Sequence, residues 1–185
     1  MSFLLSARPT IVDRIFSRSL TTDILLVTGG AALTAAAAQV TIPMFPVPMT
    51  GQTFAVLLVA ATLGLSRAAL SMVLYVLVGS LGAPIFAGAA SGFFGATTGY
   101  LIGFIAAAVV VGYLAEKGWD RTPLKVAATF ALGSLVIYAF GVSWLSIYLG
   151  SVGAANDLVT SLTLGMFPFL VGDALKAALA AALLP

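Results

Sequence analysis

Residues 56–80 read VLLVAATLGLSRAALSMVLYVLVGS, and this stretch decides how often the chain crosses a membrane. As one helix it would be a single long span. Gly64, Ser66 and Arg67 stand in its middle, however, and glycine followed by a polar and a charged residue is typical of a turn. We therefore expect two short helices here, and an even number of spans in the whole chain.

The composition of the whole chain is that of an integral membrane protein. Of its 185 residues, 61% are hydrophobic and 8% are charged, and the mean hydropathy is +1.15. Soluble domains carry about 25% charged residues. A chain of this length has room for about six spans with short loops, and none for a separate soluble catalytic domain.

Hydrophobic runs separated by turn residues predict an all-α membrane protein, a compact bundle of six transmembrane helices. We expect residues 1–21 to be a cytoplasmic or interfacial segment and 22–185 to be one transmembrane six-helix domain. The predicted spans cover residues 22–40, 50–64, 67–82, 95–115, 123–145 and 161–184.

The positions of the basic residues support this number of spans. With six spans, all seven basic residues outside the last span lie on the same side, and the opposite loops, 41–49, 83–94 and 146–160, contain no Lys or Arg. The positive-inside rule then places both termini in the cytoplasm of a multi-pass protein in the bacterial cell membrane. These seven residues are Arg8, Arg14, Arg18, Arg67, Lys117, Arg121 and Lys125.

The N-terminal residues allow two interpretations. Arginines followed by ILLVTGGAALTAAAAQV have the look of a cleavable signal, although the charged region before the apolar run is too long for an ordinary one. Residues 3–20, where Leu4, Ile11 and Ile15 stand against Arg14 and Arg18, could instead form an amphipathic helix on the inner leaflet.

The chain lacks the residues that several classes of chemistry require. The chain has no Cys and no His, which removes thiolate nucleophiles, the usual zinc ligand sets and a Ser-His triad. No segment matches the phosphate loop of ATPases, and no basic tract suggests nucleic acid. We expect no catalytic residue, no metal and no cofactor, so that any ATP-driven work must come from partner proteins.

The loops on the predicted outer side are unusual. The segment VTIPMFPVPMTGQTF (40–54) carries Pro43, Pro46 and Pro48 close to Phe45, which predicts an extended, stiff segment. It is either a simple connector or a lid over an outward-facing pocket, and its apolar side chains favour the lid. In the next loop, glycines around Ser91 suggest irregular backbone lining a cavity.

Two segments show spacings that suit helix packing. Gly95, Gly99 and Gly103 recur every fourth residue and would let another helix approach closely. The first span carries small residues at the same spacing, which either bury against a neighbouring helix or form a flat face for another membrane protein. Those residues are Ala31 with Ala35 and Ala32 with Ala36.

Asp173 and Lys176 stand in the middle of the last predicted span. Their spacing of three residues places them on one helix face. Each charge at the centre of a span costs about 2.5–3.5 kcal/mol on insertion scales. If the two residues only formed an ion pair with each other, they would stabilise the protein less than two well-packed apolar residues. We expect the pair to face a pocket whose ligand offers N–H donors and a carbonyl or carboxylate acceptor on an apolar body; a cyclic urea fused to a hydrophobic ring has this form.

Three blocks together resemble one known family. The blocks are residues 47–88, from VPMTGQTF to APIFAG, residues 95–104, GATTGYLIGF, and residues 167–183, FPFLVGDALKAALAAAL. In order and spacing they are similar to the signature blocks of BioY, the biotin-binding S component of energy-coupling-factor (ECF) transporters. The resemblance extends over most of the chain, from the first span to the C-terminus.

The resemblance implies biotin uptake by a six-helix capture subunit without its own ATPase, which works with a membrane coupling (T) protein and two cytoplasmic ATPases. It assigns the Asp and Lys of the last span to the biotin head group, and the alanine-rich face of the first helix, here residues 31–38, to docking. The resemblance also implies a polar contact to biotin from the loop before the fourth span, for which Ser91 is the candidate. The candidate ligand-binding residues are then Asp173, Lys176, Gln52, Ser91, Thr97 and Tyr100.

One block departs from the family pattern, and one alternative function stays open. The family often has Gly-Pro-Thr-Gly-Gly-Tyr where this chain has residues 95–100, GATTGY, so the local backbone shape differs. The alternative is an autonomous ion-coupled carrier in which Asp173 binds a proton or cation. The absence of two evident inverted repeats disfavours it.

Overall fold

The tight turn at Gly64 is present and joins two short helices. In this computed structural model, which describes residues 10–184, Gly64 has φ +78°, a conformation that side chains other than glycine rarely adopt. A Cβ atom at Gly64 would also lie 2.7 Å from Thr10 and 2.8 Å from Glu116. The predicted break within residues 56–80 is therefore confirmed.

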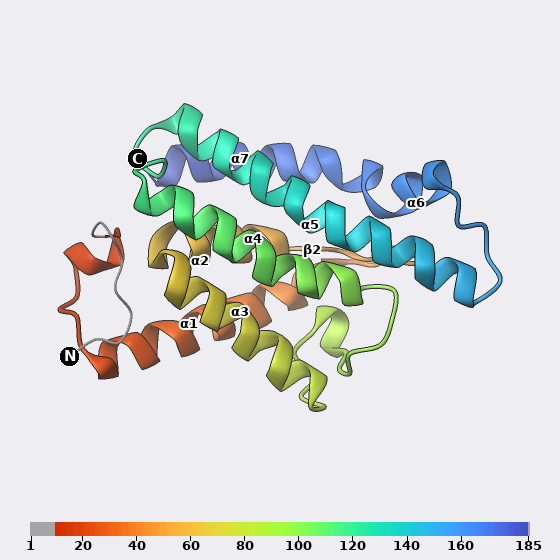
Figure 1. Cartoon of the computed structure of the whole chain (residues 1–185), viewed down its shortest axis with the longest axis horizontal. Helices are drawn as coiled ribbons and strands as arrows, with labels where there is room; N and C mark the ends of the chain where they lie inside the picture. Colours follow the sequence, from red (N-terminus) through yellow and green to blue (C-terminus); the bar gives the residue numbers. More distant parts are fainter. Residues whose placement is uncertain (1–9, 185) are drawn as a thin grey trace.

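Helices carry most of the described chain, and they pack as one bundle (Figure 1). The α-helices are α1 (Leu20–Gln39), α2 (Gln52–Leu63), α3 (Leu65–Ser80), α4 (Thr98–Glu116), α5 (Pro123–Ser151), α6 (Leu158–Gly165) and α7 (Leu170–Leu183). Three short 3-10 helices are η1 (Val12–Arg14), η2 (Ala87–Ala89) and η3 (Phe167–Phe169). Strands β1 (Thr41–Ile42) and β2 (Met49–Thr50) form a small antiparallel hairpin.

With α6 and α7 counted together, the chain runs six times between the two ends of the bundle. Figure 1 shows the start of α1 and the end of α7 at the left, with the α2–α3 turn and the connection between α4 and α5. The described basic residues outside the last span lie in segments at this end. The all-α bundle of six crossings is confirmed, and the assignment of this end to the cytoplasm stays a prediction.

Two of the crossings contain helices that are shorter than the hydrocarbon core is thick, in line with the two short helices expected from the sequence. Four helical stretches, α1, α4, α5 and residues 158–183, are long and apolar enough to cross a membrane. Helix α2 has 12 residues and α3 has 16, about 18 and 24 Å against a hydrocarbon core of about 30 Å. The β hairpin precedes α2 and residues 81–97 follow α3, both at the end of the bundle away from the Gly64 turn.

The last predicted span is broken near its middle. Helix α6 ends at Gly165, η3 follows, and α7 begins at Leu170. Pro168 lies at the start of η3 and explains the break, because proline has no N–H to donate and clashes with the preceding turn of a helix. Asp173 consequently lies in the first turn of α7, near a helix N-terminus, where a carboxylate is favoured.

Glycines set the contact between α4 and α5. A Cβ atom at Gly99 would lie 2.3 Å from Trp144, and one at Gly103 would lie 3.0 Å from the backbone of Ile137. Both glycines therefore allow the close packing of helices that their spacing predicted. Gly95 precedes the helix, and its carbonyl oxygen accepts a hydrogen bond of 2.8 Å from the Trp144 indole.

Charged residues tie the N-terminal segment to the bundle in what we call the Arg67 cluster: Arg67, Asp13, Arg18 and Asp23. Arg67 pairs with Asp13 at 2.7 Å and with Asp23 at 2.6 Å, and Arg18 pairs with Asp13 at 2.8 Å. Residues 10–19 contain only the short helix η1, so the described part of 3–20 is not one amphipathic helix; residues 3–9 lie outside the described chain.

Candidate functional site

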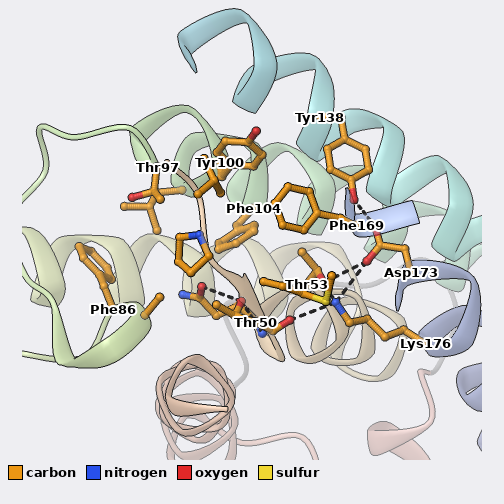
Figure 2. Close-up of a pocket in the computed structure, with 16 residues that line it drawn as sticks. Thr50, Thr53, Phe86, Thr97, Tyr100, Phe104, Tyr138, Phe169, Asp173 and Lys176 are labelled. Carbon is orange, nitrogen blue, oxygen red and sulfur yellow. Dashed lines mark hydrogen bonds and ion pairs between the residues drawn. The ribbon is translucent and has the colours of Figure 1, made fainter. Parts of the chain in front are cut away.

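A cavity lies among α2, α4, α5, α7 and the β hairpin (Figure 2). Its open space, which includes the mouth, is about 570 Å³. Most of its wall is apolar or aromatic. The lining residues are Val47, Pro48, Met49, Thr50, Gln52, Thr53, Phe86, Ala87, Thr97, Tyr100, Leu101, Phe104, Tyr138, Phe169, Asp173 and Lys176.

The Asp173–Lys176 pair lies in this wall and is connected to α2. The Lys176 ammonium lies 3.2 Å from Asp173 Oδ1. It also donates to the Thr53 hydroxyl at 2.6 Å and to the backbone carbonyl of Thr50 at 3.0 Å. The pair is largely buried, with side-chain exposures of 21% for Lys176 and 11% for Asp173. Its charge is thus balanced internally, with acceptors from two segments besides its own helix.

Asp173 receives further hydrogen bonds from two hydroxyl groups. Thr53 lies 3.5 Å from Asp173 Oδ1, and the Tyr138 hydroxyl donates to Asp173 Oδ2. A carboxylate offers about four acceptor positions. With Lys176, Thr53 and Tyr138 as partners, one position remains for a donor from the cavity. An N–H group of a ligand would find there a charged acceptor that is already oriented.

Gln52 and Tyr100, two of the predicted ligand-binding residues, line the cavity. Gln52 is buried; its amide donates to the Tyr75 hydroxyl, and its carbonyl accepts from Thr50 at 3.0 Å. The Tyr100 hydroxyl donates to the Gly165 carbonyl at 2.7 Å. Both groups are already engaged within the protein, so they shape the wall. Thr97, which precedes α4, also lines the cavity.

Ser91 lies elsewhere. It is exposed in the loop before α4 and is not among the lining residues. The residue of that region that reaches the cavity is Phe86, whose ring packs against Tyr75 at 5.3 Å. Gln39 fastens this loop, because its side chain accepts from Ala89 N at 3.0 Å and donates to the Phe86 carbonyl at 3.2 Å. The expectation for Ser91 is therefore corrected in favour of Phe86.

The predicted lid is divided between the cavity and the outside. Val47, Pro48 and Met49 line the cavity, whereas Phe45 is 91% exposed and Pro43 is also exposed. Pro46 is partly buried and follows a cis peptide bond after Phe45. The segment is non-helical, as expected, and only its returning strand covers the cavity. As lid residues, Pro43 and Phe45 are corrected to the outer surface of the hairpin.

The small residues of α1 also divide between two faces. Ala31 is buried and Ala35 partly buried, toward the bundle, whereas Ala32 and Ala36 are exposed. A docking face that includes all four is therefore wrong. The exposed small-residue face of α1 consists of Thr28, Gly29, Ala32 and Ala36.

Sequence reasoning missed several residues of the cavity. Thr53 follows Gln52 directly, and Tyr138 is one of many aromatic residues in apolar spans, so neither carried a signal of its own. The aromatic side chains of Phe86, Phe104 and Phe169 in the cavity wall resembled ordinary core residues.

Within residues 10–184, no group of three or more acidic residues could hold a metal ion.

The chain is similar to proteins that are named for biotin. The family model described as "BioY family" matches residues 8–185. A biotin transporter BioY of Thermotoga maritima is 39% identical over 81% of this chain and 86% of its own length. A probable biotin transporter BioY of Pyrococcus horikoshii is 37% identical over 85% of this chain and 91% of its own.

The fold is also that of a solved structure. The crystal structure of the S component for biotin from an ECF-type ABC transporter matches with a TM-score of 0.79 and 20% sequence identity. The match covers 91% of this chain and 92% of the other. Together with its apolar helices, these likenesses make the chain a multi-pass membrane protein. From the family model and the two relatives, the chain belongs to the BioY family.

Proposed function

We propose that this chain is the substrate-binding subunit of a biotin uptake system, and that residues 22–185 act as one capture domain without catalytic activity. The observation that carries the proposal is the buried Asp173–Lys176 pair in the wall of an apolar cavity. The similar proteins that are named biotin transporters give the ligand its identity.

The chemistry of the cavity suits biotin. Asp173 can accept an N–H of the ureido group, since a carboxylate only accepts, and Lys176 can donate to an acceptor of the ligand, since an ammonium only donates. The aromatic walls, formed by Tyr100, Phe104 and Phe169, match the apolar body of the fused rings. The acceptor that Lys176 meets is either the ureido carbonyl or the valerate carboxylate.

Titration of the purified protein with biotin, biotin amide and desthiobiotin tests the proposal. We expect saturable, one-to-one binding of biotin. Weaker binding of the amide would assign Lys176 to the carboxylate, and equal binding would assign it to the ureido carbonyl. An absence of biotin binding by folded protein would refute the proposed ligand.

Partner proteins are the second part of the proposal. Among the described residues no segment forms a phosphate loop, and the matched solved structure comes from an ECF-type ABC transporter. We propose that a membrane coupling protein and two cytoplasmic ATPases drive uptake. The exposed small-residue face of α1, with Ala32 and Ala36, is the proposed docking surface, because small residues allow close helix approach.

Large side chains on this face test the docking surface. Ala32→Trp and Ala36→Trp should abolish ATP-driven uptake in vesicles with the reconstituted partners while biotin affinity in detergent stays within about twofold. Ala131→Trp, on the exposed face of α5, is the matched control and should leave uptake intact. Accumulation by the isolated chain under a proton gradient would favour the ion-coupled carrier instead.

A further inference from the structure

The Tyr138 hydroxyl is the only described side chain of α5 that binds the Asp173 carboxylate. Figure 2 shows the ring of Tyr138 pointing from α5 toward Asp173, on the side away from Lys176. The hydroxyl donates to Oδ2, while Lys176 and Thr53 both approach Oδ1. The two oxygens of one carboxylate are therefore held from opposite sides, by α5 on one and by α2 and α7 on the other.

The ring of Tyr138 is itself fixed. Its residue is 7% exposed, and its ring lies near-parallel to that of Phe169, with 6.5 Å between centroids and 18° between planes. Phe169 is the residue directly before α7. This aromatic contact therefore helps to fix the position of the Tyr138 hydroxyl relative to the first turn of α7, which contains Asp173.

This arrangement orients the one acceptor position that remains on Asp173. Without the hydroxyl, Oδ2 would lose its partner, and the carboxylate could turn about its terminal torsion, which is broad for Asp, toward Lys176. It would then present a different and less constant direction to the cavity. Pre-organised acceptors contribute to affinity because less ordering is needed on binding.

We infer that Tyr138 is a positioning residue for ligand recognition, which acts through Asp173 and does not itself contact the ligand's N–H. The inference rests on the proposed function, since the N–H in question is that of the biotin ureido group. It assigns to α5 a role in specificity that neither the sequence motifs nor the names of the similar proteins indicate.

Tyr100 provides a matched control within the same cavity. It is also a tyrosine, is also 7% exposed and also lines the cavity. Its hydroxyl donates to the Gly165 carbonyl, so it has no bond to Asp173. Removing either hydroxyl deletes one buried hydrogen bond, and only at Tyr138 is the partner the proposed ligand-binding carboxylate.

A double-mutant cycle on biotin affinity tests the inference. We expect Tyr138→Phe to weaken biotin binding about tenfold or more, the range of a hydrogen bond to a charged group. Asp173→Asn should weaken it at least as much. The double variant should bind within about threefold of Asp173→Asn alone, because residues in one network are not additive. Tyr100→Phe combined with Asp173→Asn should instead multiply the two single effects.

A modified ligand and a tyrosine analogue at position 138 complete the test. For biotin methylated on its ureido nitrogens, the loss caused by Tyr138→Phe should fall below about twofold. The exchange Tyr138→4-aminophenylalanine, which keeps the ring and a donor, should restore most of the affinity and also serves if the Phe variant does not fold. Melting temperatures without ligand check each variant.

The outcomes separate this inference from the proposed function. If Asp173→Asn binds biotin like the wild type, the proposed site is wrong. If Asp173→Asn weakens biotin binding while Tyr138→Phe leaves it unchanged or makes it tighter, only the role of Tyr138 is refuted. An additive cycle, or a loss that persists with the methylated ligand, would make Tyr138 an ordinary structural residue.

Discussion

Within residues 10–184, two charge networks are built differently: the Arg67 cluster, at the end of the bundle that carries the Gly64 turn, and the Asp173–Lys176 pair in the cavity wall. In the Arg67 cluster, arginine forks meet the Asp13 and Asp23 carboxylates, and Arg67 is 4% exposed. In the cavity wall, a lysine and an aspartate rely on hydroxyl groups and a backbone carbonyl for their other bonds.

The difference separates a structural network from a candidate binding site. A guanidinium that bridges two carboxylates is rigid, and removing it takes the shared charged partner away from both buried carboxylates. The Lys176 ammonium binds two neutral acceptors besides the Asp173 carboxylate, and next to a cavity it can exchange a neutral acceptor for a ligand atom. The predictions below test this contrast.

The largest effect is expected at the Arg67 cluster. Arg67→Met should lower the free energy of unfolding by about 3–5 kcal/mol, since two buried carboxylates lose their shared partner. Unfolding in detergent measures this loss, and biotin affinity of the folded fraction should stay within about twofold. Lys125→Met, at an exposed residue of the same end, is the control and should be close to neutral. A binding defect in folded Arg67→Met would break the contrast.

The opposite pattern is expected in the cavity. Lys176→Met should weaken biotin binding by about 2 kcal/mol or more, roughly thirtyfold, because a charge-assisted hydrogen bond to the ligand is lost. Its effect on unfolding should be smaller than that of Arg67→Met. Calorimetric titration and the same unfolding assay give both numbers. Wild-type affinity in this variant would make the cavity pair structural as well.

A neutral member of the cavity network should show an intermediate effect. Thr53→Val removes the hydroxyl that contacts both Lys176 and Asp173 and should weaken biotin binding by about 1 kcal/mol. Thr62→Val is the control. Thr62 lies on the same helix, and its hydroxyl binds α2 backbone carbonyls, at 2.8 Å to Leu58 and 3.3 Å to Val59. Equal losses from the two variants would remove Thr53 from the ligand network.

The smallest effect concerns pH. Burial acts to raise the pKa of Asp13, but hydrogen bonds from Arg18 and Arg67 outweigh it and hold this pKa below its usual 3.8. Such a carboxylate stabilises the fold above the pKa of the unfolded chain and loses that contribution as the pH falls below it. We expect a fraction of a kcal/mol to be lost by pH 4, and more below. Asp13→Asn should flatten this dependence; an unchanged profile would contradict it.

The sequence was sufficient for those features that depend on local pattern. Hydrophobic runs and the Gly64 turn predicted six crossings, and the spacing of Asp173 and Lys176 predicted a shared face. It was not sufficient for features that depend on partners distant in the chain. The unequal roles of Ala31 and Ala32 follow from which side of α1 meets α3, and the place of Ser91 follows from how Gln39 holds its loop.

The break at Pro168 shows a second kind of limit. The proline was visible in the sequence, yet the hydrophobic run around it predicted one continuous span over 161–184. Only the packed structure shows that α7 restarts at Leu170 and places Asp173 in a first turn. Likewise, Tyr138 belongs to no sequence motif, because its proposed role depends on the contact between its hydroxyl and Asp173, a residue distant in the chain.

The order of residues along the chain has a consequence for biosynthesis. The groups that neutralise Asp173 and Lys176 come from Thr50 and Thr53 in the second crossing and from Tyr138 in the fifth. All three residues precede α7 in the chain, so the groups that neutralise both charges are synthesised before α7 itself. The final helix can therefore meet partners for its charges as it inserts, which would spare it the penalty of facing lipid with an unpaired charge.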